Sequence, residues 1–176
     1  MATLDTTDYV LGTFNRGLNT LTHILEVAEA HARENNVDFD AEWLPTRLID
    51  DMKPLSFQLQ NATSAIKLHL ARLTGDAYPY WEDNEKTLEE FKARIAQTKE
   101  FLEAVDRAKL KERLEAGMEV EMNWGSLKVK TKAGYAAVHH GIPNFLFHVQ
   151  TTYAILRSKG VPLGKKDYIE EFFNEV

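Results

Sequence analysis

The stretch from His139 to Arg157, HHGIPNFLFHVQTTYAILR, is the most informative part of the chain. It sets three of the six histidines around a proline inside an otherwise apolar run. The run predicts the last long helix of a helical bundle, from about residue 132 to 158, with Gly160 after its end. Polar groups at helical spacing on a buried segment need partners. This helix is therefore expected to carry either core hydrogen bonds or a binding site.

Polar residues recur at intervals of four along this predicted helix, and they share one face if the helix is continuous. They are His140, Asn144, His148 and Thr152. Pro143 interrupts the pattern, because it has no amide hydrogen and its ring crowds the carbonyl of residue 139. The chain therefore either kinks at Pro143, or starts a new helix there and leaves His140 in a loop. Asn144 and His148 share a face in both arrangements.

Three more helices are predicted upstream, from apolar residues that recur three and four positions apart. A capping box formed by Thr87 and Glu90 opens the third of them. Gly75 is expected to cap the second, and Pro54 suits its first position. The predicted helices span about Thr6–Asn36, Pro54–Leu73 and Thr87–Val105.

A β-hairpin is predicted between the third helix and the last one. Apolar and polar residues alternate on both sides of a glycine-containing turn at Asn123–Ser126, which is typical of two short antiparallel strands. The sequence therefore predicts a mainly α fold: a four-helix bundle with a small β-hairpin before the last helix, in a single domain over residues 1–176.

The composition excludes several functional classes. Hydrophobic residues make up 44% and charged residues 27% of the chain, as in ordinary globular proteins. A formal net charge of −6 argues against a nucleic-acid partner. The absence of cysteine excludes disulfides, thiolate zinc sites and a cysteine nucleophile. The first residues lack a signal-peptide pattern, and no apolar run could span a bilayer. We therefore expect a cytoplasmic protein with no membrane partner.

A small-molecule pocket between the second and last helices is the leading functional hypothesis. Gln58 and His69 lie on one stripe of the second helix and could point toward the last helix. With His140 and Asn144 they are the candidate ligand-binding residues. The candidate catalytic groups are His148, as an acid, base or ligand anchor, and Tyr153, as a hydroxyl donor.

Two alternatives explain the same polar residues. In the first, Asn144 and His148 only form hydrogen bonds with neighbouring helices inside the core. In the second, they bind a divalent metal ion (zinc, nickel or manganese), because a pair four residues apart on a helix can hold one ion. Asn144 is neutral and is a weak transition-metal ligand, so this site would be a degenerate one.

A third hypothesis, from another functional class, is a non-enzymatic interaction or homodimerisation module. Four large aromatic residues expected at the surface could supply apolar contact area. They are Trp81, Trp124, Phe172 and Phe173.

The connection between the second and third helices is aromatic and then acidic. Tyr78 to Trp81 could form a lid over a pocket or cover the end of the bundle. Glu82, Asp83 and Glu85 could attract a hard cation, but they lack the alternation of a calcium-binding loop. A solvated helix N-terminus is therefore the favoured interpretation of these three carboxylates.

The run PNFLFHVQTTYAILRSKGVPLGKKDY, from Pro143 to Tyr168, resembles the end of an uncharacterised bacterial and fungal domain family. Members of that family look like relatives of the DinB/YfiT-like metalloenzymes. The similarity continues upstream through RLIDDMKPLSFQLQ at residues 47–60 and WEDNEKTLEEFKARIAQTKEFL at residues 81–102. It therefore covers most of the chain.

This resemblance implies a DinB-like four-helix bundle. DinB-like metalloproteins typically use one histidine on the second helix and an H-x-x-x-H pair on the fourth. In this chain the pair corresponds to Asn144 and His148, so His148 is the one matched ligand. Gln58, Gln60 or Asn61 stands where the ligand of the second helix is expected. The resemblance brings no established reaction with it.

Overall fold

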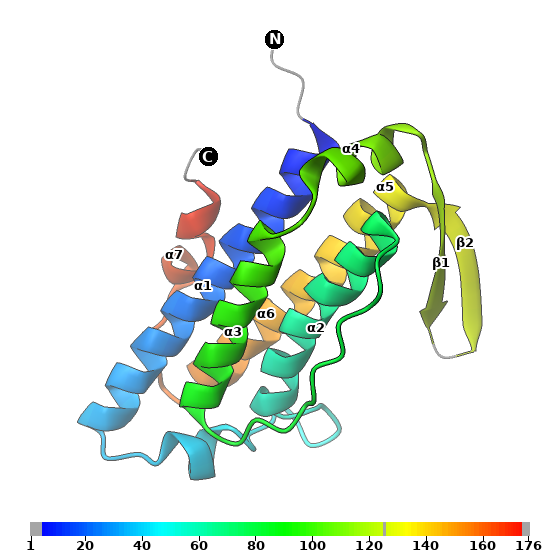
Figure 1. The fold of residues 1–176 in the computed structure, drawn as a ribbon. Helices are drawn as coiled ribbons and strands as arrows, with labels where there is room; N and C mark the ends of the chain where they lie inside the picture. Colours follow the sequence, from blue (N-terminus) through cyan, green and yellow to red (C-terminus); the bar gives the residue numbers. More distant parts are fainter. Residues whose placement is uncertain (1–4, 125, 174–176) are drawn as a thin grey trace.

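Four long helices lie side by side in the computed structural model, which describes residues 5–124 and 126–173 (Figure 1). They confirm the predicted mainly α bundle. Shorter elements connect them and complete the chain. The long helices are α1 (Thr6–Glu34), α2 (Leu55–Thr74), α3 (Leu88–Glu103) and α6 (Ile142–Ser158). The shorter elements are α4 (Arg107–Glu115), β1 (Glu119–Trp124), β2 (Leu127–Lys132), α5 (Ala133–Ala136) and α7 (Lys165–Ile169), with π-helical turns at Phe39–Trp43 and Ala137–Gly141 and a 3₁₀ turn at Glu170–Phe172.

The ends of the helices follow the local sequence signals. The Thr87 side chain accepts a hydrogen bond from the amide of Glu90, and the Glu90 carboxylate accepts one from the amide of Thr87, which completes the predicted capping box. Gly75 caps α2 with a left-handed backbone at φ 74°. Pro54 differs slightly from the prediction, because it is the N-cap of α2 and the first helical residue is Leu55.

The core of the bundle includes a close approach between α1 and α6. Phe14 and Phe145 are fully buried and meet edge to face, with ring centroids 5.5 Å apart. Gly17 lies one turn along α1, and a Cβ atom added there would stand 2.3 Å from Cε1 of Phe145. The two helices can therefore pack at this separation only because residue 17 has no side chain.

Replacing Gly17 by alanine is expected to destabilise the protein by about 1–2 kcal/mol. Overpacking a rigid core costs about 1–3 kcal/mol, and the better helix propensity of alanine offsets part of that cost. Gly12→Ala is the matched control, because the atoms that its Cβ would meet are at the far end of the long Arg16 side chain rather than in a packed ring. Urea denaturation would measure both variants. Equal stability of the two would contradict this account of the packing.

The last helical segment differs from both arrangements predicted around Pro143. α5 is followed by a π-helical turn, in which the amide of Ile142 donates to the carbonyl of Ala137. Pro143 then falls in the first turn of α6. Because it has no amide hydrogen, it cannot donate to a carbonyl of the π-helical turn before it. The prediction of a loop is therefore wrong for His140, which lies in a π-helical turn on a continuous helical path.

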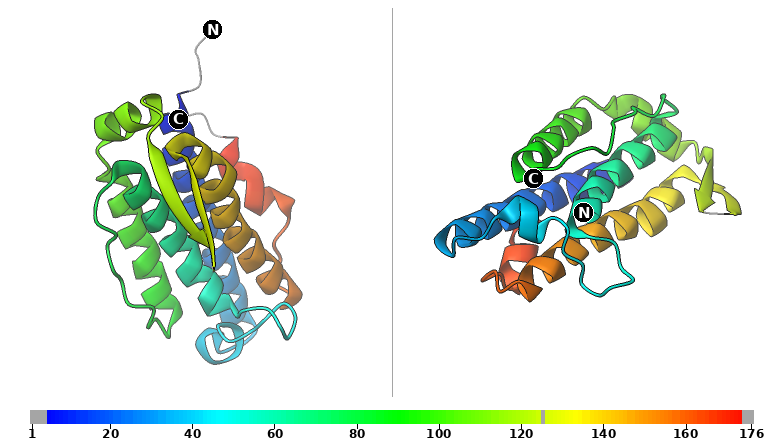
Figure 2. Two further views of the ribbon diagram at one scale, coloured as in Figure 1. Left: turned by 90° about the vertical axis from the view of Figure 1, so that its right-hand side faces the viewer. Right: turned by 90° about the horizontal axis from the view of Figure 1, so that it is seen from below.

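The predicted β-hairpin is confirmed. β1 and β2 pair antiparallel, with Glu119 opposite Lys132 and Trp124 opposite Leu127. In the left view of Figure 2 the hairpin lies in front of α2 and α6. It therefore stands on the side of the bundle where these two helices are neighbours.

The C-terminal elements pack along α1 (Figure 1). Nε2 of His23 lies 2.9 Å from Oδ1 of Asp167, and the Thr20 hydroxyl donates to the carbonyl of Tyr168 at 3.2 Å. These contacts fix α7 against the outer face of α1. None of the helices in the described part of the chain combines the length and apolar character that a membrane span requires.

The expectation that Trp81 is exposed is wrong. Its ring is half-buried, covers the ammonium of Lys67 at 3.8 Å and meets Phe101 edge to face. Lys67 is itself fully buried, and a cation over an aromatic face is a favourable arrangement there. Phe172 is also half-buried, since it stacks on Tyr168, whereas Phe173 is 76% exposed. The side chain of Trp124 lies outside the described residues.

Candidate functional site

A cavity of about 580 Å³ lies between α2 and α6, where the sequence predicted a pocket. Its volume is in the range of small-molecule sites. The structure brings four of the predicted site residues to its wall, and Asn123 of β1 closes one side. The four are His69, His140, Asn144 and His148.

Gln58 lies next to the cavity and determines the tautomer of His148. Oε1 of Gln58 is 2.8 Å from Nδ1 of His148, and Nε2 of Gln58 donates to the carbonyl of Lys53 at 3.1 Å. Because the second bond fixes the orientation of the amide, Nδ1 of His148 must carry the proton and donate. Nε2 therefore keeps its lone pair, and it has no hydrogen-bond partner among the described residues.

Burial keeps His148 neutral. The side chain is removed from water, which disfavours the imidazolium and lowers its pKa to about 4. At neutral pH the residue therefore offers a lone pair rather than a charge. Nε2 can accept a hydrogen bond or act as a weak base.

A second histidine pair lies farther along the cavity. Nε2 of His69 is 3.3 Å from Nδ1 of His140, so one ring donates and the other accepts. His69 is almost completely buried, and burial, together with the charge of Arg72 and the neighbouring His140, lowers its pKa to about 3. Gly141 permits this packing, because a Cβ there would lie 2.9 Å from Cγ of His69.

Tyr153 does not join the cavity, contrary to the prediction that it supplies a hydroxyl there. Its ring packs edge to face against Tyr168 of α7, at 6.0 Å between centroids. The reason is geometric: five residues beyond His148 on an α-helix correspond to a rotation of about 140° around the axis. Thr152 is buried, and its hydroxyl has no hydrogen-bond partner in the described structure.

The donor set does not fit the three-imidazole metal site that the resemblance implies. The residue of α2 that faces His148 is Gln58, and its amide holds the histidine by Nδ1. Asn144 stands where a second imidazole is needed, and His69 and His140 are turned toward each other. Within the described residues, no three His, Cys, Asp or Glu side chains gather closely enough to hold a metal ion.

Six of the described residues that line the cavity were not among the candidate site residues: Leu68, Arg72, Asn123, His139, Pro143 and Phe147. Arg72 follows His69 by three positions, so it continues the stripe that begins at Gln58. Following that stripe one more turn would have identified it. Leu68 and Phe147 are 36% and 55% exposed, and helical periodicity gives no sign that such surface residues border a cavity.

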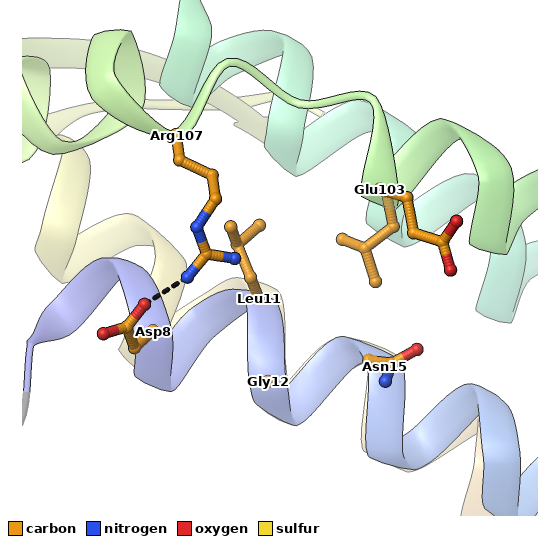
Figure 3. Close-up of a pocket in the computed structure, with 7 residues that line it drawn as sticks. Asp8, Leu11, Gly12, Asn15, Glu103 and Arg107 are labelled. Carbon is orange, nitrogen blue, oxygen red and sulfur yellow. Dashed lines mark hydrogen bonds and ion pairs between the residues drawn. The ribbon is translucent and has the colours of Figure 1, made fainter. Parts of the chain in front are cut away.

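A second hollow, of about 400 Å³, lies between α1, the end of α3 and the start of α4. Figure 3 shows Arg107 reaching across it to form an ion pair with Asp8. Both side chains are about 60% exposed. Its cation is already paired, and the described residues that line it include no histidine. The chemical groups of the cavity between α2 and α6 are therefore not repeated among these residues.

Comparisons with known proteins agree with the fold and the resemblance. The family described as "Domain of unknown function (DUF1993)" matches residues 7–169. A DinB family member protein from Shewanella denitrificans, known from a crystal structure, is 34% identical over 97% of this chain and 94% of that chain, with a TM-score of 0.84. No curated protein matches the chain. The chain therefore has a DinB-like fold and belongs to the DUF1993 family.

Proposed function

We propose that the protein binds a small molecule in the cavity between α2 and α6, with His148 as the central polar contact. The observation that carries this proposal is the fixed tautomer of His148. A buried imidazole that is held by Nδ1 and leaves the Nε2 lone pair without a partner is suited to accept a hydrogen bond from a ligand. A histidine with a purely structural role would use both ring nitrogens inside the core.

The rest of the wall supports the same function. The Asn144 amide can both donate to and accept from a ligand. Leu68 and Phe147 offer apolar surface beside it. If the protein is an enzyme, Nε2 of His148 is the group that would take a proton. Its low pKa restricts that role to substrates whose proton is already acidic.

A fragment screen by NMR tests the proposal. Titration of a ¹⁵N-labelled chain with a library of small organic fragments is expected to give saturable shifts at amides of α2 and α6 around Gln58, Asn144 and His148. His148→Ala is expected to weaken the binding of these fragments by about tenfold or more, because a buried hydrogen bond to the ligand is lost.

The matched control is His23→Ala, which removes a histidine on α1 that pairs with Asp167 outside the cavity. It should leave fragment binding unchanged. Circular dichroism of both variants would verify that they remain folded. Fragment shifts that persist at full strength in folded His148→Ala protein would refute the role of His148.

A further inference from the structure

Arg72 carries the permanent charge of the cavity wall. It lies one turn after His69 on α2, and it is half-buried. None of the described residues that line the cavity is a carboxylate. Within the described part of the chain, Arg72 forms no ion pair, whereas Arg94 and Arg107 both do. A guanidinium stays protonated at neutral pH, so the cavity holds a positive charge without a counter-ion from the described chain.

The neighbouring histidines add no further charge to that of Arg72. Burial lowers the pKa values of His69 and His140, and the charge of Arg72 lowers them further, so both rings are neutral at pH 7. The chain as a whole is acidic, with a formal net charge of −6. The cavity is therefore a local positive region on a negative protein, and this arrangement favours entry of an anion.

The wall beside Arg72 is apolar. Leu68 precedes it by one turn on α2, and Phe147 faces the same cavity from α6; both keep a large exposed fraction. Pro143 adds further apolar surface. A small inorganic anion would leave this surface in contact with water, whereas an organic anion would cover it.

We propose that the ligand class is an organic carboxylate with an apolar body. The planar fork of Arg72 pairs with the carboxylate through two parallel hydrogen bonds, and Leu68 and Phe147 contact the apolar body. This inference rests on the proposed pocket function and adds to it the chemical class of the ligand.

Calorimetric titration with 3-phenylpropionate and its neutral analogue 3-phenylpropionamide tests the ligand class on the unmodified protein. The carboxylate is expected to bind at least about tenfold more tightly than the amide. Arg72→Met should lower the affinity for the carboxylate to about that for the amide. Arg33→Met, at an exposed position near the end of α1, is the control and should have no effect.

Each other outcome overturns the assignment. Equal affinity for the carboxylate and the amide would refute the proposal that the ligand is an anion. The proposed pocket function would still stand if His148→Ala weakened the binding of both compounds. Absence of saturable binding by either compound would refute the ligand class. Phenyl phosphate binding about tenfold more tightly than the carboxylate, in a manner that depends on Arg72, would replace the carboxylate with a phosphate ester.

Discussion

Replacing Arg94 by methionine is expected to lower the free energy of unfolding by about 3–5 kcal/mol. Arg94 lies on α3, is 4% exposed and donates hydrogen bonds in several directions. Nε donates to the Thr63 hydroxyl at 2.6 Å, and Nη1 donates to the Glu85 carboxylate at 2.6 Å. Nη2 donates to Asp83 at 2.7 Å and to Ser64 at 2.9 Å. Methionine fills the space but satisfies none of these acceptors.

The loss should be large because Glu85 stays buried when its partner is removed. Its side chain is 11% exposed, and an uncompensated buried carboxylate is costly. Although burial raises the pKa of Glu85, hydrogen bonds from Arg94 and Gln60 keep it below its usual value. Without Arg94, the pKa of Glu85 should therefore rise, and the segment between α2 and α3 should lose the hydrogen bonds that hold Asp83 and Glu85 to α3.

Arg107→Met is the matched control for Arg94→Met. Its ion pair with Asp8 is exposed on both sides, so its loss should cost less than about 1 kcal/mol. Urea denaturation at pH 7 would compare the two variants. In addition, Arg94→Met combined with Glu85→Leu should recover part of the lost stability, because the stranded carboxylate is gone. Similar stability of the two single variants would show that the hydrogen bonds of Arg94 contribute no more to stability than an exposed ion pair.

The ion pairs of Arg94 with Asp83 and Glu85 could not be predicted from the sequence. Glu82, Asp83 and Glu85 were assigned to a solvated helix N-terminus. This is wrong for Glu85, whose side chain is 11% exposed and pairs with the buried Arg94 of α3. Asp83 also pairs with Arg94, but its side chain stays 53% exposed. The segment that carries them is not helical, so periodicity could not indicate which way each carboxylate points. The capping box at Thr87 was predictable because its hydrogen bonds join residues only three positions apart.

The candidate site was predictable only as far as contacts set by spacing along one helix. Spacing placed Gln58 and His69 on one stripe of α2 that could point toward the last helix, and their hydrogen bonds with His148 and His140 agree with that placement. Spacing could not show the π-helical turn before Pro143. Gly141 in that turn packs closely on His69, which is a contact between distant parts of the chain.

Acidification from pH 7 to pH 5 is expected to lower the free energy of unfolding by about 4 kcal/mol through His69 and His148. In the folded protein their pKa values lie at about 3 and about 4, mainly because both rings are buried. In the unfolded chain both return to about 6.5. The unfolded state therefore binds more protons than the folded state at every pH between these values.

The direction in which the free energy of unfolding changes with pH follows from that difference in proton binding. Above pH 6.5 both states hold neutral imidazoles, and the stability does not depend on these groups. As the pH falls below 6.5, protonation stabilises the unfolded chain by about 1.4 kcal/mol per pH unit for each histidine. The loss continues until the pH reaches the folded pKa values, near 4 and 3. Carboxylates contribute little above pH 5, because their reference pKa values lie near 4.

Urea denaturation at intervals of about half a pH unit between pH 7 and pH 5 would measure how the free energy of unfolding changes with pH. His148→Gln removes one buried imidazole, so it should reduce the fall in stability by about half. His23→Gln is the control, since that histidine is partly exposed beside Asp167, and it should leave the contribution of the two buried rings intact. If His148→Gln lost as much stability on acidification as the unmodified chain, His148 could not be held neutral inside the fold. The lone pair at Nε2, on which the proposed pocket depends, would then be absent below pH 6.5.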